Sequence, residues 1–467
     1  MASVRSRTVT SPAPENRSPT LLSRRTAILS GVLGVSVLAA GLVAQWLPRE
    51  PRAADPFAGQ ELPQVPAPDP TDEPVEVVCC AGWDSAARTP VSPMSEAVAR
   101  AQDAAGAQYA VVLLVGGVAR AVVEVCWAAH HAEVWFLDGE GRRYRGVARR
   151  RWPDGRLRLF EVRGWRYAGK GAQEFDGDRP AVRFRVRRGA TAGIEKVSVH
   201  AELAGGGSFE TSREWERWPE PTRPPDDVAV PAVNGWAALA GLTGPVTVRS
   251  GPDEVPAEFP WRPPHPLRPR HVTELTTDGT RFRVPDGRVL SVRRVPAGRI
   301  RLPSGRLLAG DPGWLDAGSA PLAVTAPPGE YAVDVFQVWE NRTGRSTWTA
   351  ACRVTVADEP VTSWEQALRA GDHELELGDG EFFGNPVDTA TFALVDHTGV
   401  TEFADADATT TGEAPYRTLS SARTDMVVVP GWSDGACLVW LGRTEDGSPG
   451  SFVLDFRVPD LADAEPG

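Results

Sequence analysis

Short apolar runs separated by turn residues fill most of the chain beyond residue 100, and this pattern limits it to a fold built from strands. The runs at 109–115 and 121–127 have strand length, and Pro-Asp-Gly at 153–155 is a typical turn. The chain also has 46 glycines and 42 prolines in 467 residues, which disfavours long helices. We therefore predict a mainly β protein, with two tandem β-sandwich or barrel-like domains after an N-terminal transmembrane or signal helix.

Strands are predicted wherever apolar residues alternate or cluster over four to ten positions. In the first half they are expected at 109–115, 121–127, 132–137, 156–162, 181–186 and 196–203. In the second half they are expected at 281–284, 289–295, 300–302, 331–338, 347–356, 392–395, 426–429, 436–441 and 452–458. Helical spacing predicts one helix within 90–108, with Ser95 as its N-cap, and a short one at 362–370.

Changes in composition divide the chain into six segments. We expect a basic leader at 1–25, a transmembrane or signal segment at 26–47, a proline-rich linker at 48–76, a β domain with a basic face at 77–218, a proline-rich connector at 219–270 and an acidic β domain at 271–460.

The N-terminal apolar run decides where we expect the protein to lie. Residues 26–47 carry no charge, and 22 residues are enough to span a bilayer as a helix. The arginines before this run favour a cytoplasmic N-terminus, so the protein would be a single-pass cell-membrane protein with its β domains outside the cell. Arg24 and Arg25 also resemble a twin-arginine export signal, which would give a secreted protein. A third possibility is a buried helix of a cytosolic protein.

Charge is distributed unevenly between the two halves. Residues 142–188 hold 16 basic and 5 acidic residues, whereas 358–467 hold 5 basic and 22 acidic ones. Arg183, Arg185 and Arg187 alternate with apolar residues, which places them on one face of a strand. They are candidates for binding a polyanion such as anionic lipid headgroups or wall polymers. The alternative is a solvated face, or one docked within the molecule against the acidic C-terminal part.

The remaining composition argues against several site classes. The five cysteines include no Cys-x-x-Cys pair, so the sequence supports no zinc or thioredoxin-like site, and we expect neither a metal nor another cofactor. Cys126 and Cys437 lie in apolar runs and are expected in the core, while any disulfide pairing stays open. No nucleic-acid-binding motif accompanies the arginines, so we do not expect a nucleic-acid partner.

Two motifs in the last third carry a family resemblance. Leu-Pro-Ser-Gly-Arg at 302–306 leads to Asp311-Pro312, and Gly-Trp-Ser-Asp-Gly at 431–435 leads to Gly442. With weaker similarity between them, residues 295–458 resemble the family of domains of unknown function numbered 4241. The chain departs from the family pattern at Ser433, Cys437 and Leu438. The resemblance implies a compact, mostly β domain and supplies no substrate, cofactor or catalytic residue.

Three residues of this family-like part are candidates for catalysis. Asp434 could act as a general base or metal carboxylate, and Asp311 could place a carboxylate at a site, although each also fits a tight turn. His373 lies among acids and could move protons or lie in a solvated loop. His130 and His131 are expected at a hairpin tip.

The sequence contains none of the common nucleophile or phosphate-loop motifs. We therefore expect a membrane-anchored extracytoplasmic binding module for a protein partner or an envelope polymer, rather than an enzyme, with its oligomeric state open. A hydrolase with an acidic C-terminal site is the first alternative, and an intracellular interaction protein is the second.

Overall fold

The computed structural model describes residues 69–175, 181–188, 195–203, 207–214, 224–404, 406, 414–431, 435–458, 461 and 463–467. The side chains of 187–188, 195–203, 207–214, 345–347 and 386 are outside this description. Contacts divide the chain into two units, residues 1–61 and residues 62–467, and all the described residues belong to the second unit. The expected leader and apolar segment at 1–47 therefore lie outside the described residues. Within the described part, no helix combines the length and apolarity needed to cross a membrane.

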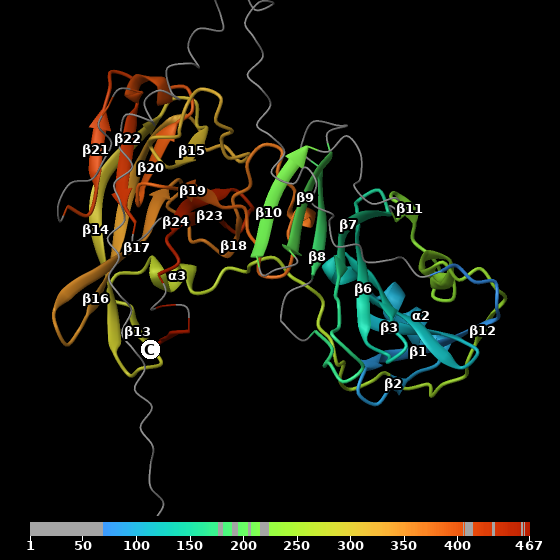
Figure 1. Cartoon of the computed structure of the whole chain (residues 1–467). Helices are drawn as coiled ribbons and strands as arrows, with labels where there is room; N and C mark the ends of the chain where they lie inside the picture. Colours follow the sequence, from blue (N-terminus) through green and yellow to red (C-terminus); the bar gives the residue numbers. More distant parts are fainter. Residues whose placement is uncertain are drawn as a thin grey trace, which may run out of the picture. The chain divides into compact units, whose positions relative to one another are not determined.

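The described part is mainly β, with 45% of residues in strands, 9% in helices and a half-barrel sheet, as the sequence predicted. The first sheet contains twelve strands in the order β10-β9-β8-β7-β6-β5-β4-β3-β1-β12, with β2 on β1 and β11 on β7 (Figure 1). Their bounds are Val75–Asp84 (β1), Thr89–Pro93 (β2), Gln108–Val115 (β3), Val118–Cys126 (β4), His131–Leu137 (β5), Arg143–Arg151 (β6), Arg156–Gly164 (β7), Val182–Arg188 (β8), Glu195–Leu203 (β9), Gly207–Glu214 (β10), Val228–Ala229 (β11) and Val246–Val248 (β12).

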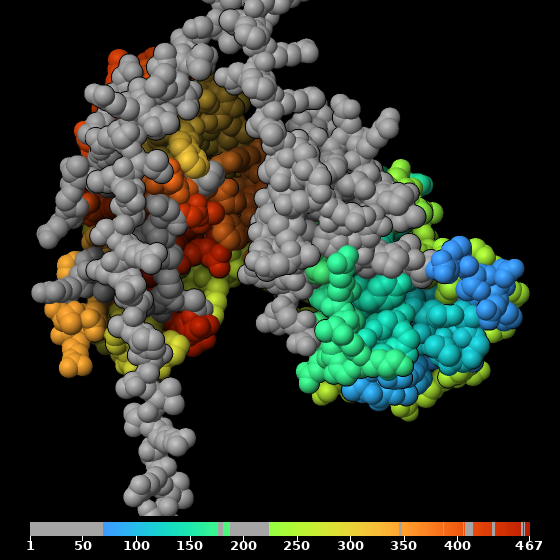
Figure 2. Space-filling view, viewed as in Figure 1, coloured from blue at the N-terminus to red at the C-terminus, as the bar shows by residue number. Residues whose placement is uncertain are grey.

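This sheet uses more of the chain than the expected domain at 77–218. β1 begins at Val75, within the expected linker, and Val75 is fully buried. β11, β12 and the 3-10 helix η3 (Trp236–Ala240) come from the expected connector. β12 pairs in parallel with β1, and Trp236 of η3 is buried in the apolar core on one face of the sheet. Figure 2 shows the part of the chain coloured blue to green as one continuous surface.

The helix expected within 90–108 is shorter than predicted. Helix α2 spans Glu96–Ala104, and the Ser95 side chain accepts the N–H of Val98, as an N-cap does. Pro90 instead belongs to β2, where it pairs with Trp83 of β1. Proline is tolerated there because β2 pairs only with β1 and thus leaves one edge unpaired.

Both faces of strands β1, β3 and β5 are buried over most of their length. One face holds an apolar core to which α2 and η3 contribute. The other face carries a smaller apolar cluster that includes Val112, Trp135 and Trp165, together with several charged residues described below. Burial on both sides explains why β3 is apolar along almost its whole length.

The second half forms a nine-stranded and a four-stranded sheet (Figure 1). The first contains Arg281–Arg283 (β13), Val289–Leu302 (β14), Gly329–Glu340 (β16), Arg345–Thr355 (β17), Ser363–Gln366 (β18), Asn385–Val387 (β19), Gly435–Arg443 (β23), Pro449–Asp455 (β24) and Glu465–Pro466 (β25). The second contains Leu307–Gly310 (β15), Thr391–Asp396 (β20), Arg417–Ser420 (β21) and Asp425–Pro430 (β22). Short helices occur at Trp127–Ala129 (η2), Val272–Leu275 (α3), Glu374–Glu376 (η4) and Val400–Phe403 (η5).

Two local predictions for this half were wrong. The helix expected at 362–370 is replaced by β18, in which Trp364 pairs with Gly442 of β23. Pairing with an available strand edge overrides the weak helical spacing of this segment. The two strands expected at 289–295 and 300–302 form one strand, β14, whose register shifts between Pro296 and Arg299.

All five cysteines are buried and free. Cys126 and Cys437 lie in the core as predicted. Burial raises the pKa of Cys79 to about 11 and that of Cys80 to about 12, so both thiols are protonated at neutral pH.

Candidate ligand-binding site

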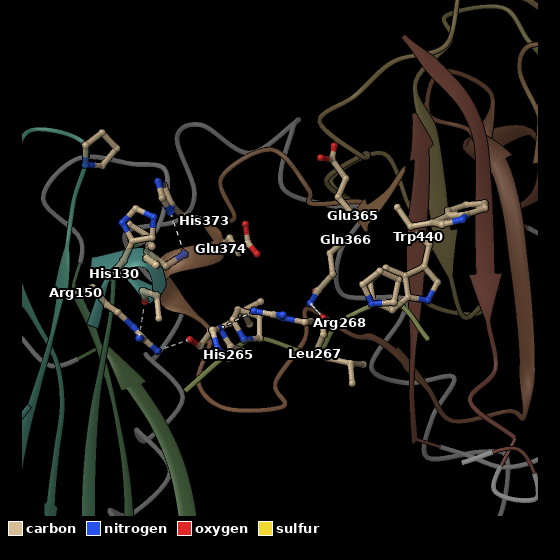
Figure 3. Close-up of a pocket in the computed structure, with 18 residues that line it drawn as sticks. His130, Arg150, His265, Leu267, Arg268, Glu365, Gln366, His373, Glu374 and Trp440 are labelled. Atoms are coloured by element: carbon tan, nitrogen blue, oxygen red, sulfur yellow. Dashed lines mark hydrogen bonds between the residues drawn. The ribbon is translucent and has the colours of Figure 1, made fainter. Parts of the chain in front are cut away.

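A cavity of about 540 Å³ gathers histidines, arginines and tryptophans from distant parts of the chain (Figure 3). It is lined by Ala128, Ala129, His130, Arg150, Pro153, His265, Pro266, Leu267, Arg268, Pro269, Trp364, Glu365, Gln366, His373, Glu374, Leu375, Leu377 and Trp440. Its size is within the range of small-molecule sites in proteins.

The connector between the halves builds one wall of this cavity. Trp261 donates its indole N–H to the oxygen of Ala81 at 2.9 Å, which ties the connector to β1. Further along, the N–H of Leu267 donates to the oxygen of Glu381 at 2.8 Å. This part of the expected proline-rich connector is therefore held at two points, and residues 265–269 line the cavity.

Three of the seven histidines in the chain line the cavity. His130 and His373 lie near one another at one end, opposite Glu365 and Trp440 (Figure 3). The ring of His373 packs on Trp152 with 4.4 Å between centroids. His373 is thus half-buried at a cavity and is not a solvated loop residue.

The histidine rings are held by specific contacts. The Nδ1 atom of His373 accepts the N–H of Leu375 at 3.2 Å. The Nδ1 atom of His265 lies 3.0 Å from the guanidinium of Arg268. Burial lowers the pKa of both His265 and His373 below the usual value near 6.5, so both are neutral at pH 7.

Two arginines give the cavity its positive charge. Arg150 is buried and donates to the backbone oxygen of Leu377 at 2.9 Å. Burial lowers its pKa to about 10, which leaves it charged at pH 7. Among the residues that the structure describes, neither Arg150 nor Arg268 forms an ion pair with a carboxylate. Of the two acids in the lining, Glu365 is already paired with Arg443 at 2.6 Å.

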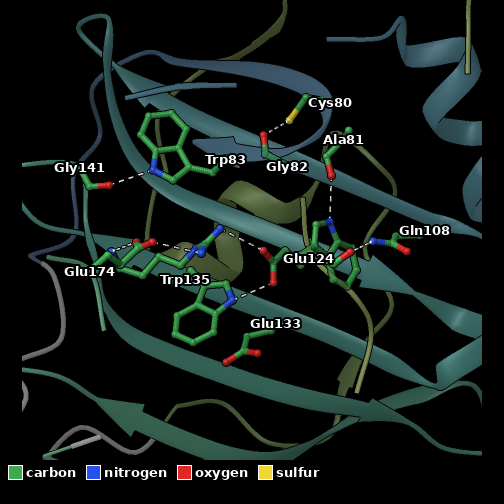
Figure 4. A network of polar contacts seen from close by, with 12 residues as sticks. Cys80, Ala81, Gly82, Trp83, Gln108, Glu124, Glu133, Trp135, Gly141 and Glu174 are labelled. Carbon is green, nitrogen blue, oxygen red and sulfur yellow. Dashed lines mark hydrogen bonds and ion pairs between the residues drawn. The ribbon is translucent and has the colours of Figure 1, made fainter. Parts of the chain in front are cut away.

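The positive charge of Arg150 adjoins a buried row of glutamates on the first sheet. Register places Glu124 of β4 opposite Glu133 of β5, and Ala148 of β6 between Glu133 and Glu161 of β7. All three glutamates are buried. The indole N–H of Trp135 donates to Glu124 at 3.0 Å (Figure 4).

Arginines neutralise this row of glutamates. Arg163 donates to both carboxylate oxygens of Glu133, at 2.6 and 2.8 Å, and Arg185 donates to Glu161 at 2.8 Å. Burial nevertheless raises the pKa of Glu133 to about 7, and the neighbouring glutamates act in the same direction. Gly146 is required here, because a Cβ atom would lie 2.4 Å from Glu133 Oε1. Glu133 and Glu161 are thus each paired with an arginine side chain of the same sheet.

His131 adjoins the same network and is not at a hairpin tip. It is the first residue of β5, it is buried, and its Nε2 lies 3.8 Å from Glu133. His130 is the left-handed cap of η2, at φ 51°. The two adjacent histidines thus have different environments, one inside the sheet and one in the cavity wall.

The three arginines of the predicted polyanion face differ from one another. Val182, Phe184 and Val186 are buried in the core on the opposite face, in line with the predicted alternation. Arg185 is itself buried and binds the carboxylates of Glu161 and Glu381. Arg183 is partly exposed and lies 3.3 Å from Glu161. The side chain of Arg187 is outside the described residues.

Asp311 does not line the cavity. It is 1% exposed and accepts hydrogen bonds from the N–H of Gly313, the N–H of Asp388, and both the N–H and hydroxyl of Thr389. Four donors satisfy the carboxylate, which closes the turn after β15. Asp434 lies outside the described residues; of the two catalytic candidates that the structure describes, His373 lines the cavity and Asp311 does not.

A second buried aspartate closes the other end of the β15–β20 pair. Asp396 is fully buried and accepts from the N–H and hydroxyl of Ser304 and of Thr398. Ser304 and Asp311 both belong to the motifs quoted above, so these motif residues have structural roles in the four-stranded sheet.

Sequence reasoning missed Arg150, His265, Arg268 and Trp440 as possible ligand contacts. The only local signal was the Pro-His-Pro sequence at 264–266, which is unusual in a connector. Among the described residues, no three His, Cys, Asp or Glu side chains are grouped closely enough to hold a metal ion.

In a comparison with protein families, residues 300–454 match the family described as "Protein of unknown function (DUF4241)". The resemblance predicted for the C-terminal part of the chain is thereby confirmed. Comparisons with curated proteins and with solved structures found no match.

Proposed function

We propose that this chain, whose C-terminal part matches a family of unknown function, is a membrane-anchored extracytoplasmic binding module with two tandem β domains. Residues 26–47 would hold it in the membrane, and the cavity would bind an anionic group of an envelope component. One observation carries the proposal. Arg150 and Arg268 line a cavity beside three histidines, and neither forms an ion pair with a carboxylate in the described part of the chain.

The lining fits an anion better than a cation or a neutral ligand. Arginine presents several N–H donors in a planar fork, which suits carboxylate and phosphate oxygens. Trp364 and Trp440 add aromatic surface for the apolar part of the same ligand. The formal net charge of the chain is −11, so the argument rests on local charge in the cavity.

The hydrolase alternative is less well supported. Acid–base catalysis requires a base within reach of the substrate. The carboxylate of Asp311 is already occupied by four donors outside the cavity. His373 faces the cavity, but its Nδ1 is engaged by the backbone of Leu375.

Replacing Arg268 by glutamine is expected to weaken anion binding by roughly tenfold, the effect of losing one charge-assisted hydrogen bond. The measurement is titration of the full-length protein in detergent with inorganic pyrophosphate, followed by tryptophan fluorescence, since Trp364 and Trp440 line the cavity. The matched control is Arg262→Gln, because Arg262 lies on the same connector, is exposed and pairs with Asp379 outside the cavity. Equal affinity of wild type and R268Q would contradict the proposal.

Lower pH is expected to strengthen pyrophosphate binding. The pKa of His265 and of His373 is lowered in the free protein, so both are neutral at pH 7 and become charged at a lower pH than an ordinary histidine. A bound anion favours the protonated rings and therefore raises these pKa values, so binding takes up protons. Affinity should rise as the pH falls from 7.5 to 5.5, and less so in the H265Q/H373Q double variant. An unchanged pH profile in that variant would rule out His265 and His373 as the cause.

The proposed location has its own test. Protease added to intact cells should degrade the part after residue 61, because positively charged residues before the apolar segment favour a cytoplasmic N-terminus. The measurement is an immunoblot with an epitope tag at the C-terminus, and a cytoplasmic protein serves as the lysis control. Protection in intact cells together with digestion in lysed cells would contradict the proposed location.

A further inference from the structure

A second cavity, of about 290 Å³, adjoins the first. The two share the lining residues Leu267, Arg268 and Trp440. The second cavity continues along the same connector, past Arg270 and His271. Residues of the segment 265–271 thus border both cavities, and an extended segment of this length reaches at most about 22 Å.

Positive charge continues into the second cavity. Arg457 lines it with its guanidinium 4.9 Å above the ring of Phe382, and within the described residues it has no ion pair with a carboxylate. Arg270 contributes less, because it pairs with Glu465 at 2.9 Å. Arg268 lines both cavities. Arg150 in the first cavity, Arg268 in both and Arg457 in the second therefore form no ion pair with a carboxylate among the described residues.

The one carboxylate in the second cavity is engaged internally. Asp455 is buried and accepts the indole N–H of Trp440 at 2.9 Å and the N–H of Arg457 at 2.8 Å. Burial also raises the pKa of Asp455. Its negative charge is therefore partly offset, and it opposes an anionic ligand less than an unbonded carboxylate would.

Apolar side chains lie between these charges. Leu275, Phe282 and Leu461 line the second cavity, and Trp440 faces both cavities. A ligand that follows the groove therefore meets arginines at intervals, separated by apolar surface. A single small anion could contact only one of these positions.

We infer that the two cavities form one groove for a linear polyanion, a chain with a phosphate or carboxylate on successive units, and that Arg268 contacts it at the junction. This inference rests on the proposed function and specifies its ligand. Several contacts on one chain gain from high effective concentration, so a long ligand binds more tightly than its unit. Phosphate and carboxylate polymers share the required chemistry.

The test compares short and long probes on variants of each cavity in the full-length protein. The probes are inorganic pyrophosphate and linear polyphosphate of at least ten units, with poly-L-glutamate to distinguish carboxylate from phosphate. H373Q alters only the first cavity, R457Q only the second, and R268Q the junction. R262Q is the control. R457K shows whether a positive charge at position 457 is sufficient for polyphosphate binding.

Polyphosphate is expected to bind at least tenfold more tightly than pyrophosphate. R457Q and H373Q should each weaken polyphosphate binding by roughly tenfold, whereas at most one of them should affect pyrophosphate. R457Q should also reduce the slope of log affinity against log salt by about one, the effect of losing one contact to a charged polymer. R457K should retain most of the affinity.

Two failures are distinguishable. If R457Q leaves polyphosphate binding unchanged while R268Q and H373Q weaken both probes, the extended groove is wrong and the single binding cavity stands. If polyphosphate binds no more tightly than pyrophosphate, the extended groove is also wrong. If R268Q and H373Q change binding of no probe, the proposed function itself is wrong. Thermal unfolding of each variant identifies any loss of affinity that comes from misfolding.

Discussion

Replacing Arg163 by methionine is expected to lower the free energy of unfolding by about 3–5 kcal/mol, the usual effect of removing one partner from a buried ion pair. Arg163 donates to both oxygens of Glu133 and lies 3.2 Å from Glu161. Methionine retains part of the apolar stem that packs on Trp135 but leaves two buried carboxylates without this partner. Urea denaturation of the full-length protein measures the change.

Two further variants separate the loss of the ion pair from other effects of R163M. Arg156 lies on the same strand as Arg163, is exposed and pairs with Asp227. Arg156→Met should therefore lower the free energy of unfolding by at most about 1 kcal/mol. Glu133→Gln in the R163M background replaces one of the carboxyl groups left without an arginine partner by a neutral amide. It should recover part of the lost stability. A cost for R163M no larger than that for R156M would show that the glutamate row does not depend on Arg163.

Replacing Gly305 by alanine is expected to destabilise the protein by about 2–4 kcal/mol, because it adds left-handed strain and a steric clash. Gly305 has φ +69°, and a Cβ atom there would lie 1.8 Å from the oxygen of Ala326. That oxygen cannot move freely, because the N–H of Ala326 donates to the oxygen of Gly305 at 2.9 Å. The shift of the urea midpoint is the measurement.

Gly298 provides the matched control for Gly305. It also has positive φ, +87°, but a Cβ atom there meets nothing within 4 Å. Gly298→Ala should therefore cost only the backbone strain, about 1–2 kcal/mol. Equal destabilisation by the two substitutions would mean that the approach to Ala326 is not what requires glycine at position 305.

These expected costs give the family-like motifs a physical meaning. Gly305 turns the chain from β14 into β15, Ser304 binds the buried Asp396, and Asp311 closes the turn at the far end of β15. Each residue satisfies a backbone or side-chain requirement of the four-stranded sheet. A motif built in this way identifies a fold and carries no information about the ligand.

Local pattern predicted many of the apolar strands, but it missed the long strands β1, β6 and β10 and was a poor guide to isolated short segments. The alternation at 182–186 correctly placed Val182 and Phe184 on the core face, since the side-chain period of a strand is fixed. Ser95 was correctly predicted as a helix N-cap. The segment around Trp364 was predicted as a helix but is a strand, because its partner β23 is about 75 residues further along the chain.

The sequence by itself determined the β class, the core-facing residues of β8, the burial of Cys126 and Cys437 and the family resemblance, because each depends on residues close together in the chain. Only the tertiary structure brought His130, His265 and His373 to one cavity and placed Glu133 against Arg163. Such contacts depend on strand register and on the path of the connector. Long-range pairing sets both, and no local spacing of residue types encodes it.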